Sequence, residues 1–295
     1  MKILITGAQG QLGRSLQDVF RSRGLNCLAF TRKELDITNL SQVRETIFKA
    51  KVDVIVNAAA YTNVEQAEID TLNAFSINEL GAGNLAIVAS ECNSSLIHFS
   101  TDYVFSGLSI TPWKVDSETK PLSIYGKSKL AGERIIEREN PENSIIIRTS
   151  WLYSPHGKNF FKTILRRAIR ENGSISVVDD QLGQPTNAQD LAFQVASIIE
   201  NRTQRGIFHI TNSGIASWFD FAVEIFKLNG SDIDRVRPIS SSEFQNKAER
   251  PSYSALDNSK IIESSLIAMP AWQDSVQRSF PDIKKAVMEE IFYEN

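Results

Sequence analysis

Three glycines spaced three residues apart follow the first apolar run of this chain and open its first helix-length segment. The run is Lys2–Thr6, and the glycines are Gly7, Gly10 and Gly13. At a strand-to-helix junction, glycine allows a tight turn, a close approach of the backbone to phosphate, and close packing of helix on strand. The helix N-terminus offers unpaired N–H groups to an anion. The spacing differs by one residue from the usual dinucleotide fingerprint, but its position predicts a nucleotide site.

Short β-branched runs alternate with helix-length segments over roughly the first 200 residues. The runs are almost continuously apolar, which is typical of strands covered on both faces. Repeated strand–helix units imply right-handed crossovers and a parallel, doubly wound Rossmann sheet of the α/β class. The expected strands are 2–6, 25–30, 53–57, 95–100, 144–149 and 206–211. The expected helices between them are 11–23, 40–50, 71–91 and 128–139.

The C-terminal third differs in character, with one strand-like run and several amphipathic segments. We expect a strand at 174–178 and helices at 187–200, 217–228, 258–265 and from 272 onward. This pattern predicts a dinucleotide-binding domain over 1–150, with about 187–212 returning to its sheet. Residues 151–186 and 213–295 would then form a smaller, mainly helical substrate-binding lobe.

Composition excludes several classes of function. The 42% of apolar residues supply a sizeable core, and 32 basic against 35 acidic residues leave no positive excess for nucleic acid. No apolar run approaches the ~18–20 residues that span a bilayer, and the short apolar run at 3–5 is not expected to be a signal peptide. Cys27 and Cys92 form no disulfide or metal pattern, and the three histidines are scattered, so a zinc site is not expected. The sequence predicts a cytoplasmic protein without a membrane partner.

The end of the second expected strand bears on the choice of cofactor. A carboxylate there would bind ribose hydroxyls and favour NAD, but this chain has Arg32. Arg32 could form a bidentate pair with a 2′-phosphate, which favours NADPH over NADH, or it could be a solvated charge at the end of the strand. Asp36 could accept from the adenine amino group or belong to a helix-capping turn. NADH therefore stays open.

Tyr125 and Lys129 are four residues apart and would share one face of a helix. An ammonium beside a phenol lowers the phenol pKa toward neutrality, so Tyr125 could exchange a proton with a carbonyl or alcohol. The pair alone is also compatible with an exposed helix face. A polar cluster, Ser100–Tyr103, ends the fourth expected strand, where ligands bind in open α/β sheets. Thr101 could hold the substrate oxygen there for Tyr125.

With these motifs in view, the chain resembles the extended short-chain dehydrogenases/reductases and, within them, the dTDP-4-dehydrorhamnose reductase family. The matching segments cover nearly the whole chain and are 6–13, 57–65, 100–107, 125–133, 148–153, 179–186 and Arg250-Pro251. Their combination is specific to the family, although no single motif is. The resemblance implies NADPH-dependent reduction of the C4 ketone of dTDP-4-dehydro-L-rhamnose to dTDP-L-rhamnose, a step of cell-surface polysaccharide biosynthesis.

The resemblance also implies roles for individual residues. Those expected at the cofactor are Gly10, Gln11 and Leu12 on the pyrophosphate, Asp36 and Ile37 at the adenine, Ala60, Tyr61 and Thr62 along the middle, and Phe99 nearby. Tyr125 would donate the proton, and Lys129 would bind the nicotinamide ribose. The residues expected at the sugar nucleotide are Thr101, Asp102 and Trp151. Without the resemblance, Trp151 would be taken as a core aromatic, and Arg250, a pyrophosphate partner by charge alone, is expected to be an ordinary surface arginine.

Related functions are separated by single residues. Sugar-nucleotide 4,6-dehydratases carry Asp-Glu where this chain has Asp102-Tyr103, so the base for dehydration is missing. A 4-epimerase needs only the Ser/Thr, Tyr and Lys set and stays open, as does a related nucleotide-sugar 4-ketoreductase. A non-catalytic regulatory subunit similar to the β subunit of methionine adenosyltransferase is a further alternative, although the presence of Thr101, Tyr125 and Lys129 argues against it.

A magnesium ion bound by glutamates at a dimer contact occurs in some members of the resembled family. This chain has Ser15 where a carboxylate would help. That difference argues against the metal, and with it against that mode of dimerisation, while a homodimer stays open.

Overall fold

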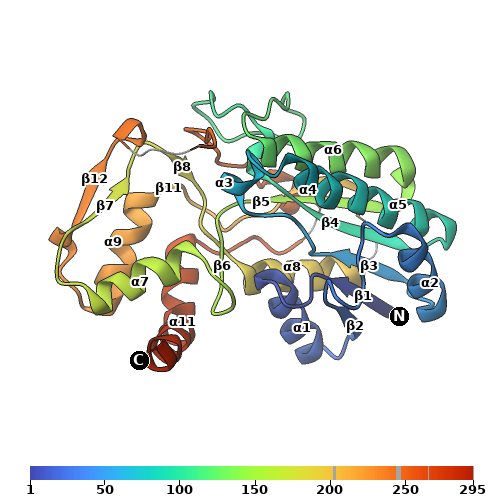
Figure 1. Cartoon of the computed structure of the whole chain (residues 1–295), viewed down its shortest axis with the longest axis horizontal. Coiled ribbons are helices and arrows are strands. Elements are labelled where there is room, and N and C mark those ends of the chain that lie inside the picture. Colours follow the sequence, from blue (N-terminus) through green and yellow to red (C-terminus); the bar gives the residue numbers. More distant parts are fainter. Residues whose placement is uncertain (202–203, 244–246, 265, 295) are drawn as a thin grey trace.

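A computed structural model describes residues 1–201, 204–243, 247–264 and 266–294 (Figure 1). Its centre is a six-stranded sheet in which every neighbouring pair is parallel, in the order β2–β1–β3–β4–β5–β10. The strands are β1 (Lys2–Thr6), β2 (Asn26–Phe30), β3 (Val54–Asn57), β4 (Ser95–Thr101), β5 (Ser144–Thr149) and β10 (Gly206–His209). The expected parallel sheet is confirmed.

The strand order reverses between β1 and β3. From β1 the chain continues to β2 on one side, and it then returns to place β3 on the other side of β1. Loops that leave two neighbouring strands in opposite directions open a crevice at their carboxyl ends. The glycine loop follows β1 directly, so it lies at this crevice.

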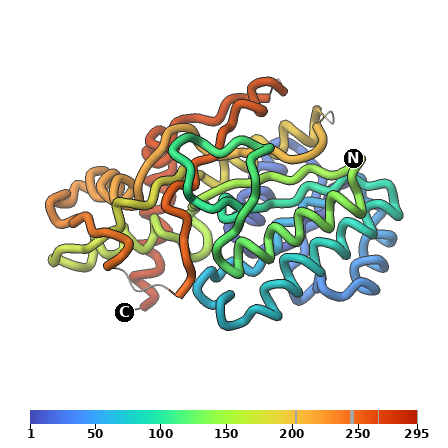
Figure 2. The backbone as a smooth tube through the Cα atoms, turned by 90° about the horizontal axis from the view of Figure 1, so that it is seen from above, coloured from blue at the N-terminus to red at the C-terminus, as the bar shows by residue number. Residues whose placement is uncertain are grey.

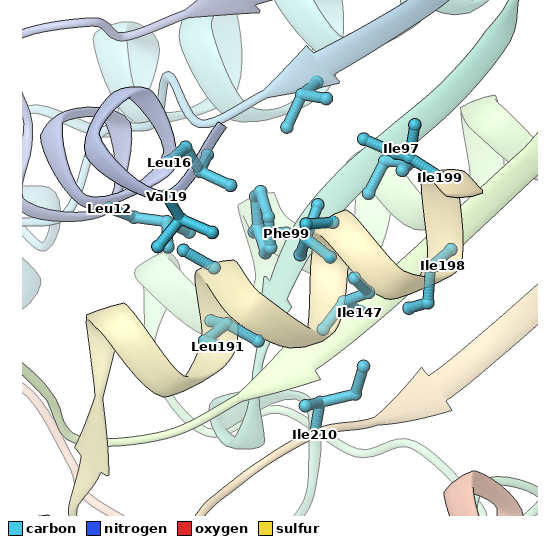
Figure 3. Close-up of a cluster of buried hydrophobic side chains, with 14 of the residues drawn as sticks. Leu12, Leu16, Val19, Ile97, Phe99, Ile147, Leu191, Ile198, Ile199 and Ile210 are labelled. Carbon is cyan, nitrogen blue, oxygen red and sulfur yellow. The ribbon is translucent and has the colours of Figure 1, made fainter. Parts of the chain in front are cut away.

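Helices cover both faces of the sheet (Figure 1). One face carries α2 (Leu40–Ala50), α5 (Ala82–Glu91) and α6 (Ile124–Glu139), whose apolar side chains share one buried cluster. The other face carries α1 (Gln11–Ser22) and α8 (Ala188–Asn201). Figure 3 shows Leu16 and Val19 of α1 facing Leu191 of α8 over the sheet. The apolar stripe on α1 explains this packing, because residues spaced by three and four share one face of a helix.

Two helices differ from their expected form in ways that affect the site. The expected helix 71–91 is a continuous run of α4 (Thr71–Phe75), the π-helical turn η1 (Ser76–Gly81) and α5, preceded by the short α3 (Val64–Ala67). Helix α6 begins at Ile124 instead of at 128, because the Ser123 hydroxyl accepts from the Gly126 N–H and caps it. Tyr125 and Lys129 therefore lie on one helix.

A second lobe extends from the sheet at the left of Figure 1. It contains α7 (Phe160–Arg170), α9 (Trp218–Asn229), α11 (Trp272–Glu294) and the parallel pair β7 (Ile175–Val178) with β12 (Val236–Ile239). Its own buried cluster, which includes Phe161, Phe221 and Trp272, shares no residue with the clusters of the sheet within the described ranges. Separate cores support two domains; the boundary near residue 150 stays a prediction.

Several short elements were missed by sequence reasoning, because two or three residues carry no periodicity. They are β6 (Leu152–Tyr153) paired with β9 (Thr186–Asn187), β8 (Leu182–Gly183) paired with β11 (Ala216–Ser217), and the 3₁₀ turns η2 (Asp102–Val104), η3 (Pro141–Asn143), η4 (Ile233–Arg235) and η5 (Ser241–Glu243).

The chain returns to the first lobe near α10 (Ser259–Glu263), which lies beside β10 (Figure 2). Ile261 and Met269 join the buried cluster between the sheet and α8. The sequence pattern predicts that all of 213–295 belongs to the second lobe, whereas Ile261 and Met269 pack in the core of the first lobe. Residue 265, the end of the expected helix 258–265, lies outside the described residues. Within the described ranges no helix is both long and apolar enough to cross a membrane.

Candidate active site

A cleft runs along the carboxyl edge of the sheet between the two lobes. It consists of two adjoining pockets of about 270 and 660 Å³ that share Gly10 and the backbone segment 58–60 after β3. The smaller pocket includes Arg32, Asp36 and Ile37. The larger one includes the sequence-predicted residues Gln11, Leu12, Ala60, Thr62, Phe99, Thr101, Asp102, Tyr125, Lys129 and Trp151. The fold thus brings most of these residues to one elongated cavity.

The glycine loop forms the floor where the two pockets meet. Gly7 has a φ of 68°, and a Cβ there would stand 2.6 Å from the Ala58 carbonyl carbon. A Cβ on Gly13 would stand 2.2 Å from the Gly7 carbonyl oxygen, and Gly13 lines neither pocket. Gly13 therefore serves the packing of α1 on the loop. Gly10 is the N-cap of α1 and provides no side chain to its first N–H groups, so this helix end can receive an anion.

The smaller pocket places opposite charges beside an apolar wall. The Asp36 carboxylate accepts from the N–H and hydroxyl of Thr38, which lowers its pKa, and the charge of Arg32 acts in the same direction. Asp36 thus makes a local turn and lines the pocket at the same time. Ile37 is buried. A positive group and an apolar surface together suit a phosphorylated ribose and its base.

The segment after β3 separates into residues that face the cleft and one that does not. Ala60 and Thr62 line it, whereas Tyr61 lines neither pocket. The Tyr61 hydroxyl donates to Asp70 at 3.2 Å, and its N–H donates to the Asn78 side chain at 2.8 Å. Phe99 also lines the larger pocket, while its ring points into the core between the sheet and α8 (Figure 3). Tyr61 therefore supports the wall from behind.

Tyr125 differs from its expected electrostatic state. Burial raises the pKa of Tyr125 to about 12, and a hydrogen bond with Thr101 opposes that rise only in part. The expectation of a pKa lowered by Lys129 is wrong for this cleft. The Lys129 Nζ instead donates to the Phe99 carbonyl at 2.6 Å and lies 3.1 Å from the His98 Nε2. Burial also lowers the pKa of Lys129, to about 8. Desolvation is the largest cause of both shifts.

The end of β4 supplies a buried polar wall. The Thr101 hydroxyl donates to the Asp102 Oδ1 at 2.9 Å and accepts from the Tyr103 N–H. Burial raises the pKa of Asp102 to about 6 against the opposing hydrogen bonds of Ser254 and Thr101. Among the described residues, no side chain pairs with the Ser100 or Thr149 hydroxyl, and both line the cleft. Buried polar atoms of this kind favour a ligand rich in hydroxyl groups.

Trp151 is held in the cleft by the second lobe. Its backbone is left-handed, with a φ of 47°, directly after β5. The indole stacks on that of Trp218 with ring centroids 3.5 Å apart and an interplanar angle of 6°. A Cβ on Gly183 would meet the Trp151 ring at 2.6 Å, so the glycine makes room for it. Trp151 lines the cleft as an aromatic platform and is not a core aromatic.

Some residues of the cleft were missed by sequence reasoning or wrongly placed. Arg250 is only 28% exposed, pairs with Glu65 at 2.9 Å and lines the larger pocket. The expectation of an ordinary surface arginine is therefore wrong. Trp218, Lys158 and Asn159 also line the pocket. No local signal marks these residues, since a separate lobe carries them to the sheet.

A metal site is not apparent in the part of the chain that the structure describes. No group of three or more His, Cys, Asp or Glu side chains is arranged there to hold an ion. Ser15 is buried, and its hydroxyl donates to the Gln11 carbonyl of its own helix.

Comparison with known proteins identifies relatives along nearly the whole chain. The family model described as the RmlD substrate binding domain matches residues 1–285. A dTDP-4-dehydrorhamnose reductase of Mycolicibacterium smegmatis is 39% identical, with 94% of this chain and 84% of the relative covered. A dTDP-4-keto-6-deoxy-D-glucose reductase of Streptomyces niveus is 38% identical over 94% of this chain and 96% of its own.

A solved structure has the same arrangement. The dTDP-4-dehydrorhamnose reductase of Bacillus anthracis, in complex with NADP, superposes with a TM-score of 0.91 at 37% identity. The match covers 95% of this chain and 99% of that one.

Proposed function

Since the chain belongs to the dTDP-4-dehydrorhamnose reductase family, we propose that it reduces the C4 ketone of dTDP-4-dehydro-L-rhamnose to dTDP-L-rhamnose with NADPH. The observation that carries this proposal is the convergence of Thr101, Tyr125 and Lys129 on a single cleft that continues to the glycine loop. A product of this kind is a building block for cell-surface polysaccharides. The relative from Streptomyces niveus supports a closely related 4-ketosugar as the alternative substrate.

The cleft fits an extended dinucleotide. Its two pockets meet over the glycine loop, where Gly7 has no room for a side chain and Gly10 begins a helix. Asp36 and Ile37 would hold the adenosine, Arg32 the 2′-phosphate, and Gly10, Gln11 and Leu12 the pyrophosphate. Ala60 and Thr62 would line the middle, and Lys129 would bind the nicotinamide ribose. The bound nicotinamide supplies a hydride.

Tyr125 is suited to act as the acid in a reduction. With a pKa of about 12 it holds its proton at neutral pH. Tyr125 would donate to the ketone oxygen, and the Thr101 hydroxyl, which donates to the Asp102 Oδ1 in the free protein, would turn to the same oxygen. As the carbon accepts the hydride, the Tyr125 Oη proton passes to that oxygen. Stabilising donors placed at the developing oxyanion lower the barrier. A protonated Lys129 would then stabilise the phenolate that remains.

The substrate side of the cleft offers groups for a sugar nucleotide. The Asp102 carboxyl can bind a sugar hydroxyl, and the stacked indoles of Trp151 and Trp218 offer an apolar face for the sugar ring. Arg250 contributes a positive charge on the same wall. A dehydratase would need a base beside Asp102, but Tyr103 occupies that position, and burial raises its pKa further.

A spectrophotometric assay tests the proposal. Purified protein is supplied with a panel of dTDP- and UDP-linked 4-ketosugars, each with NADPH and with NADH. We expect one NADPH consumed per ketosugar reduced, fastest with the dTDP-linked 4-dehydro-rhamnose. Interconversion of sugars with retained NAD and no net consumption would indicate a 4-epimerase. Absent turnover together with a stoichiometric partner enzyme in a pull-down would indicate a regulatory subunit.

We extend the proposal to location and assembly. Free Cys27 and Cys92 are compatible with the reducing cytoplasm. A homodimer stays a prediction, which sedimentation velocity can check.

A further inference from the structure

A chain of buried polar side chains leads from Lys129 into the sheet. The His98 Nε2 lies 3.1 Å from the Lys129 Nζ, and the His98 Nδ1 lies 2.9 Å from the Asn57 Nδ2. Asn57 in turn accepts at Oδ1 from the Thr6 hydroxyl at 2.7 Å and from the Ala59 N–H at 3.2 Å. His98, Asn57 and Lys129 are each at most 2% exposed. The proposed reaction as described above uses neither His98 nor Asn57.

The partners of Asn57 decide how its amide is oriented. The Ala59 backbone N–H can only donate, so the side-chain oxygen of Asn57 must face it. The amide nitrogen of Asn57 then faces the imidazole and donates to the His98 Nδ1. A neutral imidazole that accepts at Nδ1 carries its hydrogen at Nε2. Full burial beside Lys129 lowers the pKa of His98 well below its usual value, so the ring is neutral.

The hydrogen at Nε2 points toward the Lys129 Nζ. An ammonium has three donors and no acceptor, so it would face this N–H donor to donor. A neutral amine has a lone pair that accepts from Nε2, and it still donates to the Phe99 carbonyl at 2.6 Å. Only the amine form satisfies both contacts at once.

We propose that His98 is a positioning residue whose Nε2–H, oriented by Asn57, donates to the Lys129 Nζ and thereby favours the neutral amine of this lysine over its ammonium. Protonation of Lys129 then requires the imidazole to move its hydrogen to Nδ1 and the Asn57 amide to turn over. That turn leaves the Ala59 N–H without its acceptor, which is costly for a buried group. His98 thus couples the charge of the lysine to a rearrangement beneath the cleft.

Other charged and titratable groups around Lys129 act in different directions. Glu133, one turn further along α6, favours the ammonium. Its carboxylate is bound by Arg148 of β5 at 2.7 Å, and the positive charge of that arginine opposes the effect of Glu133. Tyr125 precedes Lys129 by one turn of α6, and η2 adds Asp102 and Tyr103. None of these groups donates to Nζ among the described hydrogen bonds, so His98 is the neighbour that opposes protonation by a direct contact.

A first experiment reads the network without any assay of turnover. Two-bond ¹⁵N–¹H spectra of the intact protein identify the tautomer of His98, and spectra of ¹³Cε-labelled lysine follow the titration of Lys129, assigned with Lys129→Met. We expect a neutral His98 ring whose hydrogen is at Nε2 at pH 9 and moves to Nδ1 as Lys129 is protonated, with a Lys129 midpoint near the value of about 8 that burial sets. A ring with its hydrogen at Nδ1 at pH 9, where Lys129 is neutral, would overturn the proposal.

A variant separates positioning from simple packing. In His98→Gln, the amide oxygen can accept from an ammonium, so the Lys129 midpoint should rise by about one pH unit. His209→Gln is the matched control, because His209 is equally buried but contacts Arg148 instead of Lys129. An unchanged Lys129 midpoint in folded His98→Gln, or an equal rise in His209→Gln, would contradict the proposal.

The kinetic consequence rests on the proposed reductase activity. If the ammonium is the active form, kcat/KM falls as pH rises through the Lys129 pKa, and His98→Gln should move that falling limb upward with the NMR midpoint. A purely structural defect would lower kcat/KM by one factor at every pH. A protein that shows the expected spectra but reduces no ketosugar would refute the proposed function and leave the role of His98 standing.

Discussion

Trp218 at the start of α9 lies face to face with Trp151, which follows β5 of the central sheet, with the two ring centroids 3.5 Å apart. The contact joins the end of β5 to the start of α9. Both rings line the larger pocket, so the stack forms part of the wall of the cleft.

Trp218→Ala should weaken binding of the ketosugar while leaving the chemistry intact. Loss of an aromatic stacking pair removes about 1 kcal/mol beyond the lost buried area, so we expect KM for the ketosugar to rise about tenfold with kcat little changed. Steady-state kinetics measure both constants. Trp218→Phe should keep most of the affinity. An unchanged KM in Trp218→Ala would show that the stacked indoles do not contribute to binding of the ketosugar.

Tyr125→Phe tests the acid directly. The variant keeps the ring, and with it the edge contact to Tyr103 at 5.6 Å, but it loses the proton. A positioned general acid contributes typically 10²–10⁴-fold, so kcat should fall by about that factor. NADPH affinity, measured by fluorescence titration, should fall by no more than about tenfold, because a neutral hydrogen bond contributes about 0.5–1.5 kcal/mol. A variant that retained most of its turnover would exclude Tyr125 as the proton donor.

Arg32→Gln should change cofactor preference. Removing a guanidinium that binds a 2′-phosphate costs about 1.5–3 kcal/mol, so NADPH affinity should fall roughly 10–100-fold while NADH affinity stays the same. Isothermal titration of each cofactor measures the difference. Lys33→Gln is the control, since Lys33 is the exposed neighbour and does not line the pocket. Equal losses of affinity for NADPH and NADH would show that Arg32 does not bind the 2′-phosphate.

Glu133→Gln should destabilise the fold. The Arg148–Glu133 pair joins β5 to α6, with side chains 3% and 1% exposed. Removing one partner leaves a buried charge, which costs about 3–5 kcal/mol in the free energy of unfolding. Urea unfolding measures the loss. The exposed Arg138–Glu139 pair supplies the control, and Glu139→Gln should cost less than about 1 kcal/mol.

Asp102 should make stability depend on pH. Burial raises its pKa to about 6 from an ordinary value of 3.8, so the folded protein binds this proton more tightly than the unfolded chain. The contribution is fully present below about pH 4 and is lost as pH rises through 6, by up to roughly 3 kcal/mol. Urea unfolding of the wild type and of Asp102→Asn at pH 4 to 7 should show this component only in the wild type. If the free energy of unfolding changed with pH equally in both proteins, the raised pKa of Asp102 would be contradicted.

Much of the fold is legible in local patterns. Strands that are covered on both faces are continuously apolar, and helices that are buried on one face are amphipathic. These two patterns predict the parallel sheet and its helices. The glycine loop is equally local, since its turn depends on consecutive residues. Helix α6 was placed too late because its start depends on a cap, Ser123, that follows a long irregular segment.

The pKa values of the cleft residues, and the full set of residues that line the cleft, could not be predicted from the sequence. The pair Tyr125 and Lys129 could be recognised by spacing, but their pKa values follow from burial and from partners such as His98 and the Phe99 carbonyl. Arg250 and Trp218 reach the cleft only because a second lobe folds back over the carboxyl edge of the sheet. The amino-acid sequence alone therefore determines the helices and strands and identifies the candidate reactive side chains. Only the tertiary structure sets the pKa values of these side chains and which residues share the cleft, because desolvation and contacts between distant segments arise only in the folded protein.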